Sequence, residues 1–155
     1  MKISLRTLSL TNFNASDQKK FNFIKEINSD EKISEFVMDN VGSLFINNNS
    51  KIGPAYIVKD KDEYVGFVYF ENATKEKIVL NYGVHKDHRN KKYGTKILEE
   101  VSSFILNRTV IKNVELHING YNIGSIKCAK GANFKLEETM QLGFNNEMLT
   151  FRKHK

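Results

Sequence analysis

The sequence predicts an α+β protein with a single mixed β-sheet flanked by helices, and three observations lead to this prediction. Apolar residues alternate with a period of two between Ala55 and Val84, which is typical of strands. A helical pattern of apolar residues begins at Tyr93. Strand and helix patterns then alternate toward the C-terminus, which implies parallel crossover connections. Because 155 residues is the length of one ordinary domain, we expect one domain over residues 1–155.

The N-terminal third is expected to form one strand and two helices. Residues 3–11 show imperfect alternation and predict a single strand. Asp17 is expected to cap the first helix, and Ser29 or Asp30 the second. Their apolar residues at helical spacing are Phe21, Ile24 and Ile27 in the first helix and Ile33, Phe36 and Val37 in the second.

The middle of the chain is predicted to be an antiparallel meander, because its polar turns are too short for crossovers. Its three strands are expected at 55–58, 64–70 and 78–84. Gly83 lies inside the third strand, where a glycine predicts a bulge or a close backbone approach. Such a feature would splay this strand from the strand expected at 114–118 and open a cleft.

The C-terminal half is predicted to contain two βαβ units. A helix begins at Tyr93 and is followed by the strand at 114–118. A second crossover helix runs from Asn122 to about Gly131 and leads to a strand at 134–136, and the last strand covers roughly 147–152. The helix that begins at Tyr93 has an apolar face of Tyr93, Ile97, Leu98, Val101, Phe104 and Ile105 and a polar face of Lys96, Glu99, Glu100 and Ser103.

Composition narrows the classes of function. The single cysteine, Cys128, excludes an internal disulfide and fits a reducing compartment. No apolar run reaches the length of a signal peptide or a membrane span, so we expect a cytoplasmic protein with no membrane partner. We also expect no metal site. The net charge of +6 suits a polyanionic partner, although scattered lysines usually form a solvated surface. One cationic cluster requires a specific explanation: Lys86, His88, Arg89, Lys91, Lys92 and Lys96.

The segment from Val84 to Thr95 links the end of a strand to the start of a helix and has the chemistry of a phosphate site. A helix N-terminus presents unpaired N–H groups and a positive dipole end. Gly94 allows a phosphate to approach the backbone, and the flanking cations attract it. The segment lacks the spacing of a Walker-A loop and the Gly-x-Gly-x-x-Gly pattern of dinucleotide-binding folds.

This segment resembles the acetyl-CoA pyrophosphate loop of the GNAT superfamily of N-acetyltransferases, whose pattern is Arg/Gln-x-x-Gly-x-Gly/Ala. Arg89 and Gly94 match the two ends of the pattern, and Lys92 replaces its first glycine. If that position requires a positive φ, lysine costs on the order of 1 kcal/mol or more. If φ stays negative, Lys92 contributes only its charge.

A second segment also resembles the family, whose pattern there is Asn-x-x-Ala/Ser, a helix and then Gly-Phe. Asn122, Ser125 and Phe134 match, whereas Asn133 replaces the usual glycine. The resemblance implies that the Asn122 side chain meets the pantetheine arm near the thioester. The version with serine is closest to the ribosomal-protein and spermidine-type N-acetyltransferase branches. The order of the elements also resembles the GNAT fold over nearly the whole chain.

The resemblance implies an N-acetyltransferase that transfers an acetyl group from acetyl-CoA directly to a primary amine. The backbone near Gly83 is expected to position the thioester and to offer an N–H group to the oxyanion. The expected cofactor-binding residues are Tyr82, Gly83, Val84, Arg89, Asn90, Lys91, Lys92, Tyr93, Gly94, Thr95, Asn122 and Ser125.

The catalytic residues are less defined by the sequence. His117 lies opposite the apolar residues of its strand and five residues before Asn122, so it is the candidate general base, with packing as the alternative. Glu115 shares its face and is the second candidate. Relatives often carry a tyrosine acid at the position of Ala129 here. The remaining candidates for the general acid are Tyr82, Tyr121, Cys128 and water.

Three readings of function stay open, together with the acceptor. Besides an N-acetyltransferase, the chain fits a non-catalytic CoA-binding sensor or, less well, a basic nucleic-acid-binding domain, which lacks the stacking aromatic residues usual in that class. The acceptor is a small-molecule or peptide amine, for example a polyamine, an aminoglycoside or a peptide N-terminus. The helices at 17–40 and the loop at 142–144 are expected to shape its pocket. The oligomeric state, monomer or homodimer, stays open.

Overall fold

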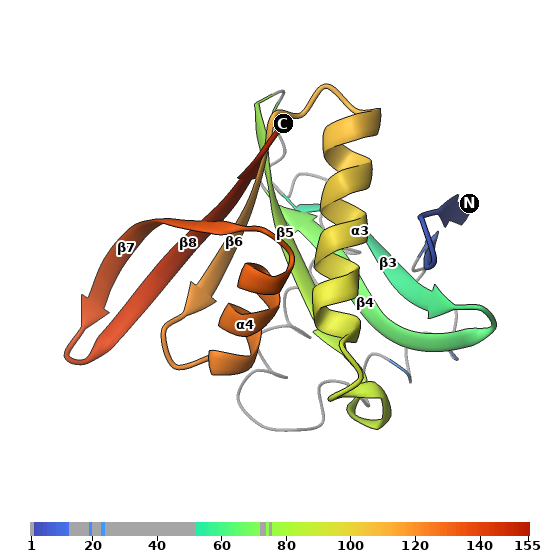
Figure 1. The fold of residues 1–155 in the computed structure, drawn as a ribbon, viewed down its shortest axis with the longest axis horizontal. Helices are drawn as coiled ribbons and strands as arrows, with labels where there is room; N and C mark the ends of the chain where they lie inside the picture. Colours follow the sequence, from blue (N-terminus) through green and yellow to red (C-terminus); the bar gives the residue numbers. More distant parts are fainter. Residues whose placement is uncertain (1, 13–18, 20–22, 24–51, 72–73, 75) are drawn as a thin grey trace.

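A computed structural model describes residues 2–12, 19, 23, 52–71, 74 and 76–155. Within these residues, eight strands form one mixed sheet and two α-helices pack against it, which confirms the predicted α+β class (Figure 1). The two helices predicted between residues 17 and 40 lie outside the described residues, apart from residues 19 and 23, which are helical.

The elements follow the predicted order, and the strands toward the C-terminus are longer than predicted. The order of strands across the sheet is β1-β2-β3-β4-β5-β6-β8-β7. A short 3-10 helix, η1, occupies Lys86–His88, and the α-helices are α3 (Tyr93–Arg108) and α4 (Ile123–Gly131). The strands are β1 (Lys2–Ser4), β2 (Ser9–Asn12), β3 (Ile52–Asp60), β4 (Glu63–Glu71), β5 (Lys77–Val84), β6 (Asn113–Asn119), β7 (Lys135–Gly143) and β8 (Asn146–His154).

The single strand predicted at residues 3–11 is wrong, because this segment forms the antiparallel hairpin of β1 and β2. The turn between the strands is closed by a hydrogen bond from the Leu5 N–H to the Leu8 carbonyl. The Glu100 carboxylate accepts hydrogen bonds from the N–H groups of Thr7 and Leu8 and from the Thr7 hydroxyl. A residue 92 or 93 positions away therefore fixes this turn, and Glu100 is buried rather than on a polar face of α3.

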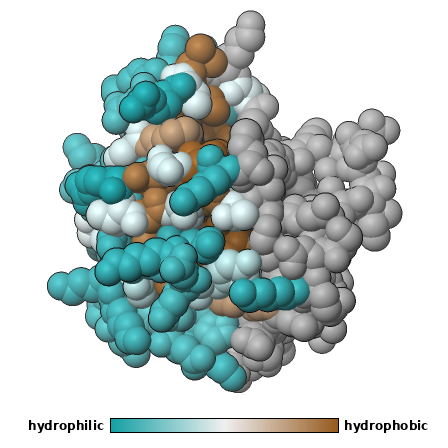
Figure 2. Space-filling view, turned by 90° about the vertical axis from the view of Figure 1, so that its right-hand side faces the viewer, coloured by the Kyte–Doolittle hydropathy of each residue, from teal (hydrophilic) through white to brown (hydrophobic). Residues whose placement is uncertain are grey.

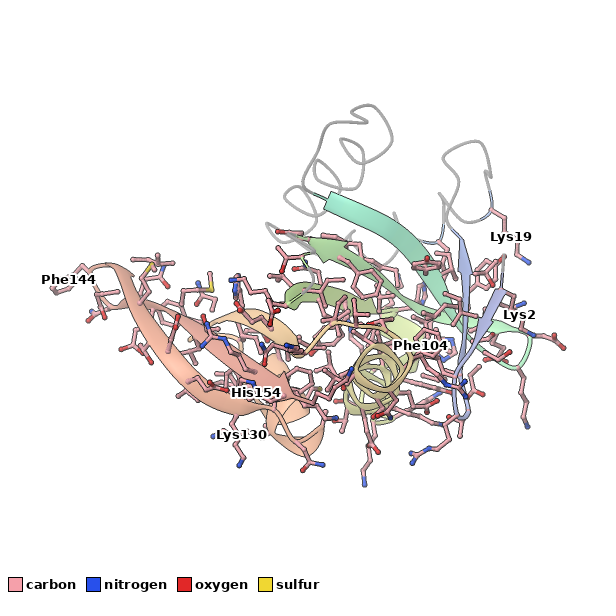
Figure 3. The ribbon with its side chains drawn as sticks, turned by 90° about the horizontal axis from the view of Figure 1, so that it is seen from above. Lys2, Lys19, Phe104, Lys130, Phe144 and His154 are labelled. Carbon is pink, nitrogen blue, oxygen red and sulfur yellow. The ribbon has the colours of Figure 1, made fainter. Side chains whose placement is uncertain are left out.

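The hydrophobic core lies between the sheet and the two helices. Both helices cover the same face of the sheet (Figures 1 and 3). In α3, Ile97, Leu98 and Val101 are almost fully buried, which confirms the predicted apolar stripe. No helix in the described part of the chain is long and apolar enough to cross a membrane. On the side that carries the N-terminal strands, most of the described surface is hydrophilic, with a band of apolar residues in the middle (Figure 2).

The second parallel crossover predicted around α4 is only partly correct. The β7 strand does not pair with β6, because β8 lies between them and is antiparallel to both. The β7–β8 hairpin extends beyond α4, away from the rest of the sheet (Figure 1). The short strand predicted at 134–136 is therefore a nine-residue edge strand, which is exposed along its whole length.

The parallel pair β5 and β6 separates soon after it begins. Pairing joins only Lys77–Val79 to Asn113–Glu115, although both strands continue for several residues. Gly83 does not form the predicted bulge, since its pairing with β4 stays in register. The close approach at Gly83 comes from the Phe67 ring, because an added Cβ would lie 2.4 Å from that ring. The predicted splay is present, but it begins four residues before Gly83.

Candidate functional site

The loop that joins β5 to α3 contains two residues in the left-handed region. Asn90 has φ of 61° and Lys92 has φ of 65°. The family position that usually holds glycine therefore does adopt a positive φ here, and lysine occupies it. Asn133, the other replacement for a family glycine, has φ of 67°, and asparagine tolerates this conformation better than most residues.

The N-terminus of α3 is open to an anion. Lys92 is its N-cap and makes no side-chain capping hydrogen bond. The first helical bond joins the Lys96 N–H to the Lys92 carbonyl, and no acceptor among the described residues is hydrogen-bonded to the N–H groups of Tyr93, Gly94 and Thr95. Three unpaired donors and the positive end of a 16-residue helix favour a bound anion at this point.

The predicted loop residues form a cationic rim around this helix end. Arg89, Asn90, Lys91 and Lys92 are exposed. The Arg89 Nε donates to the Val84 carbonyl 3.2 Å away, so its guanidinium is held close to the end of β5. The loop therefore combines backbone donors with positive side chains, as a phosphate site requires.

Gly94 and Thr95 form the contact of α3 with α4. A Cβ on Gly94 would lie 2.7 Å from the Cys128 Sγ and 3.4 Å from the Tyr82 ring. A Cβ on Gly131 would lie 3.1 Å from the Thr95 Cγ2. A side chain at position 94 would therefore force the Cys128 Sγ to move, which is a packing constraint that the sequence did not reveal.

Three predicted residues bridge the gap between β5 and α4. Tyr82 donates from its hydroxyl to the Ser125 Oγ at 3.2 Å. The Asn122 side chain caps α4 by accepting from the Ser125 N–H at 3.1 Å. Burial raises the pKa of Tyr82 well above its ordinary value, with Cys128 adding to the rise and the Ser125 hydrogen bond opposing it. The phenol is therefore neutral and serves as a hydrogen-bond donor.

The two predicted catalytic residues are in direct contact on β6. The His117 Nε2 lies 3.0 Å from the Glu115 Oε1. The His117 side chain is 41% exposed, whereas the Glu115 side chain is 4% exposed. Both point away from the face that packs on α3, as the alternation predicts. The pair therefore places a half-exposed imidazole on a buried carboxylate.

The Glu115 carboxylate stays ionised because cations surround it. Its Oε2 lies 3.2 Å from the Arg152 Nε and 3.4 Å from the Lys77 Nζ. Burial alone would raise the pKa of Glu115, but the hydrogen bonds from His117 and Arg152 and the nearby positive charges lower it below its usual value. A carboxylate held in this state accepts hydrogen bonds only, so the His117 Nε2 carries a proton toward it. In a neutral ring, Nδ1 is then the nitrogen without a proton.

The other candidates for the general acid differ in position. Ala129 occupies the expected position of a tyrosine acid, is fully buried and offers no acidic group. Tyr121 is 68% exposed, and its hydroxyl donates to the Asn145 carbonyl at the end of the β7–β8 hairpin. Cys128 is half-buried against Gly94. Of these groups, the Tyr82 phenol is the one that joins β5 to α4.

Sequence reasoning missed the residues that hold these groups from a distance. Arg152 comes from β8 and Lys77 from the start of β5, and no spacing in the sequence indicates their contact with Glu115. Asp60, at the end of β3, accepts a hydrogen bond of 2.6 Å from the Tyr93 hydroxyl. Such cross-sheet partners become visible only when strand order and register are known.

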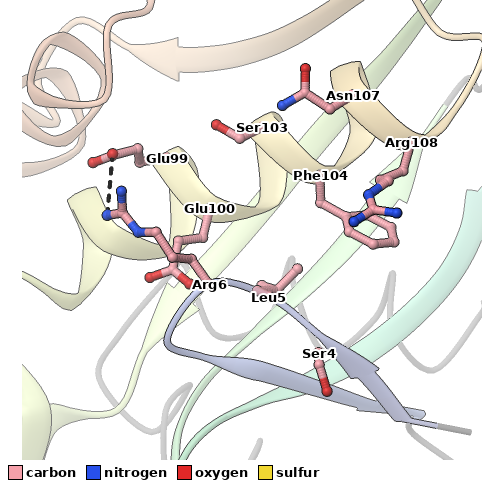
Figure 4. Close-up of a pocket in the computed structure, with 9 residues that line it drawn as sticks. All are labelled: Ser4, Leu5, Arg6, Glu99, Glu100, Ser103, Phe104, Asn107 and Arg108. Atoms are coloured by element: carbon pink, nitrogen blue, oxygen red, sulfur yellow. Dashed lines mark hydrogen bonds and ion pairs between the residues drawn. The ribbon is translucent and has the colours of Figure 1, made fainter.

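A groove of about 340 Å³ lies elsewhere, between α3 and the β1–β2 turn (Figure 4). The Arg6 guanidinium spans it to Glu99 at 3.4 Å, and the Glu100 carboxylate is occupied by the turn. None of the predicted site residues lines it. The lining residues are Ser4, Leu5, Arg6, Glu99, Glu100, Ser103, Phe104, Asn107 and Arg108.

Comparison with known proteins gives one family. Residues 21–134 match the profile of the acetyltransferase (GNAT) family. No curated protein sequence matches the chain.

Solved structures of acetyltransferases share the fold at low identity. The Salmonella typhimurium enzyme that modifies the N-terminal serine of ribosomal protein L7/L12 has a TM-score of 0.77 at 14% identity and covers 100% of this chain and 99% of its own. The Campylobacter jejuni N-acetyltransferase PseH, in complex with acetyl coenzyme A, has a TM-score of 0.72 at 11% identity, with 96% and 99% covered. A point mutant of the Vibrio cholerae spermidine N-acetyltransferase SpeG has a TM-score of 0.72 at 12% identity, with 96% and 94% covered.

Proposed function

The chain belongs to the GNAT family of acetyltransferases, which transfer an acetyl group from acetyl-CoA to an amine, and on this premise we propose which of its residues perform the transfer. The loop from Arg89 to Thr95 binds the pyrophosphate, the gap between β5 and β6 holds the pantetheine arm, and His117 takes the proton of the amine. The observation that carries the proposal is the open α3 N-terminus behind the left-handed residues Asn90 and Lys92.

The residues present fit a CoA pyrophosphate. Left-handed residues turn successive backbone N–H groups toward one side, which forms an anion-binding concavity. The N–H groups of Tyr93, Gly94 and Thr95 extend this set of donors into the helix. Lys91 and Lys92 add positive charge at the rim, and the guanidinium of Arg89 lies close by. Neutral backbone donors and cationic side chains together suit a dianionic group.

The separation of β5 from β6 supports a site for the pantetheine arm. Among the described residues, β5 has no strand partner on its β6 side after Val79, so the backbone groups of Tyr82 and Val84, which alternate with those that pair with β4, have no strand partner on that edge. An extended chain with amide groups can bind such an edge as an added strand would. Asn122 and Ser125 lie across the gap, with Tyr82 bonded to Ser125. One backbone N–H near Gly83 would then stabilise the oxyanion.

The Glu115–His117 pair supports proton transfer from the amine. When bound, acetyl-CoA would supply the acetyl group as a thioester; attack by an amine would form the amide C–N bond and break the C–S bond, and CoA would leave as a thiolate that takes a proton from water. An amine is mostly protonated at neutral pH, so a base must remove a proton before attack. His117 accepts this proton at Nδ1, and Glu115 orients the ring and stabilises the imidazolium that forms. Glu115 is assigned the orienting role because Arg152 and Lys77 hold it ionised and buried.

The acceptor, location and assembly are proposed only in general terms. The acceptor is a small-molecule or peptide amine that reaches His117 on the face of the sheet opposite α3. The proposed location is the cytoplasm, and a free Cys128 is compatible with its reducing conditions. A homodimer is proposed on the exposed β7 edge, which carries the exposed side chains of Met140 and Leu142. Sedimentation analysis, which gives the mass in solution, tests this last point.

The experiment that tests the function is acetyl transfer from acetyl-CoA to a panel of amines. The panel should contain a polyamine, an aminoglycoside, a peptide with a free N-terminus and small metabolite amines. Release of free CoA thiol, measured in the presence and absence of each amine, reports turnover. We expect at least one amine to accelerate thiol release. No binding of CoA at millimolar concentration, measured by the shift of the melting temperature, would contradict the proposal.

A further inference from the structure

We infer that Asp60 and Tyr93 form a strap that holds the anion-binding loop in shape before the cofactor arrives, and that Glu63 and His88 reinforce it. The inference rests on the proposed function, because it assumes that this loop binds the pyrophosphate of CoA. Asp60 and Glu63 are positioning residues, since they act on the loop and not on the reacting atoms. They belong to the turn between β3 and β4, far from the loop in sequence.

Two contacts join this turn to the loop. The Tyr93 hydroxyl donates to the Asp60 Oδ2 at 2.6 Å, and the His88 Nε2 lies 3.9 Å from the Glu63 Oε2. The rings of His88 and Tyr93 meet edge to face, with centroids 5.7 Å apart and planes at 83°. Asp60 is the last residue of β3 and Glu63 the first of β4, and they pair with each other, so both contact the loop from the paired end of a hairpin whose register shifts between Val58 and Lys59.

The loop needs support from outside because its own conformation is costly. A positive φ is unfavourable for lysine and better tolerated by asparagine, and the loop contains one of each, Lys92 and Asn90. The helix end that follows has no side-chain cap. A segment with these features keeps one shape only when its surroundings determine it. Tyr93 is the residue at which α3 begins, so a fixed Tyr93 fixes the direction of the first helical N–H groups.

The charge of the strap makes the inference testable. Asp60, Asp62 and Glu63 place three carboxylates in the turn beside a site proposed to bind a dianion. If Coulomb repulsion alone mattered, removal of any of these charges should strengthen CoA binding. If the strap positions the loop, removal of Asp60 should weaken binding in spite of the lost repulsion. The two effects therefore predict opposite signs for the same substitution.

The test is calorimetric titration of CoA into the purified protein and four variants. Asp60→Ala removes the acceptor and its charge, and Tyr93→Phe removes only the hydroxyl. We expect each to weaken CoA binding by about tenfold, since hydrogen bonds to charged groups are among the stronger ones in proteins. Asp60→Asn keeps an acceptor without the charge and should bind CoA at least as well as the natural chain. Asp62→Ala is the matched control, because it removes one charge from the same turn without touching the strap.

Amide hydrogen exchange without ligand gives a second reading that does not depend on activity. The amide of Lys96, whose hydrogen bond to the Lys92 carbonyl is the first of α3, should exchange faster in Asp60→Ala and Tyr93→Phe, and at the natural rate in Asp60→Asn. The inference is overturned if Asp60→Ala binds CoA as tightly as the natural chain or more tightly, or if Asp62→Ala weakens binding as much as Asp60→Ala. Failure of the natural chain itself to bind CoA would instead refute the proposed function, so the two failures are distinguishable.

Discussion

The two sides of the β5–β6 gap are built in different ways. On the β5 side, backbone N–H groups at the start of α3 form the proposed anion site, and side chains supply only charge at the rim. On the β6 side, the proposed site is the His117 ring, which contacts Glu115, and Glu115 in turn contacts Arg152 and Lys77. The first side depends on local conformation, and the second on contacts between strands far apart in sequence.

This difference has a practical consequence for binding and catalysis. Substitutions of single loop side chains should change cofactor affinity only moderately, because several backbone donors share the ligand. Substitutions in the β6 network should change turnover strongly and cofactor affinity little, because one atom carries the proton transfer. The four predictions below test this separation, from the largest expected effect to the smallest.

His117→Ala should reduce turnover with an amine about 100-fold or more while CoA affinity stays nearly unchanged, because general-base catalysis contributes a factor of about this size. Steady-state kinetics, together with CoA titration, measures both effects.

A matched histidine provides the control for this variant. The His154 Nε2 lies 2.6 Å from the Glu137 Oε2, so it is also a histidine paired with a glutamate, at the far end of β8. His154→Ala should keep turnover close to that of the natural chain. A fully active His117→Ala protein would refute the assignment and direct attention to Glu115 or to a water molecule.

Glu115→Gln should lower turnover about tenfold or more, since an amide neither holds the imidazolium nor balances Arg152 and Lys77. It should also lower the free energy of unfolding by roughly 1.5–3 kcal/mol near neutral pH, the range for hydrogen bonds to charged groups. Urea unfolding of both proteins gives the difference.

The pH dependence of that difference has a definite sign. The folded-state pKa of Glu115 lies below its unfolded value of 4.5, so its contribution is fully present above that value and is lost as the pH falls through the folded-state pKa. The natural chain should therefore lose stability in acid faster than Glu115→Gln, and the two curves should approach each other at low pH. Parallel curves throughout would show that Glu115 is not held ionised.

Gly94→Ala should destabilise the fold by about 1–3 kcal/mol, because its Cβ would lie 2.7 Å from the Cys128 Sγ and overpack the contact of α3 with α4. Cys128→Ala in the same protein removes that sulfur and should restore most of the loss. Thermal unfolding of the two single variants and the double variant forms the cycle.

CoA affinity that stays low in a stable double variant would show that the glycine also allows close approach of the phosphate. An additive cycle would mean that the two residues do not interact.

Lys92→Gly should leave stability unchanged or raise it by up to about 1 kcal/mol, since relief at the positive φ is partly offset by the entropy of glycine. Lys91→Gly is the control, because Lys91 has no positive φ and should lose about 0.5–1 kcal/mol. Denaturant unfolding measures both, and equal losses in the two variants would contradict the strain assigned to Lys92.

Most of the fold was predictable from local patterns. The meander, the amphipathic stripe of α3 and the start of α4 at Asn122 depend on alternation, helical spacing and capping, which are encoded by neighbours in sequence. Errors arose where distant residues decide. Glu100 closes the turn between β1 and β2, and β8 takes the place beside β6 that the simple crossover rule gives to β7.

The candidate site divides in the same way. The proposed anion loop could be picked out from the sequence because a helix start, a glycine and cations lie in one short segment. His117 and Glu115 were predictable as residues on one face, but their contact and the ionised state of Glu115 depend on Arg152, which pairs across the sheet. The role of Gly94 in packing and the contact of Tyr93 with Asp60 involve partners 33 or more residues away.

The most direct test of the central claim is the set of backbone amide NMR shifts during a titration with CoA. We expect the largest shift changes on residues 89–95 and on Tyr82, Gly83 and Val84 at the edge of the gap, with smaller shift changes on Asn122 and Ser125. Changes concentrated elsewhere, for instance in the groove between α3 and the β1–β2 turn, with residues 89–95 unmoved, would contradict it.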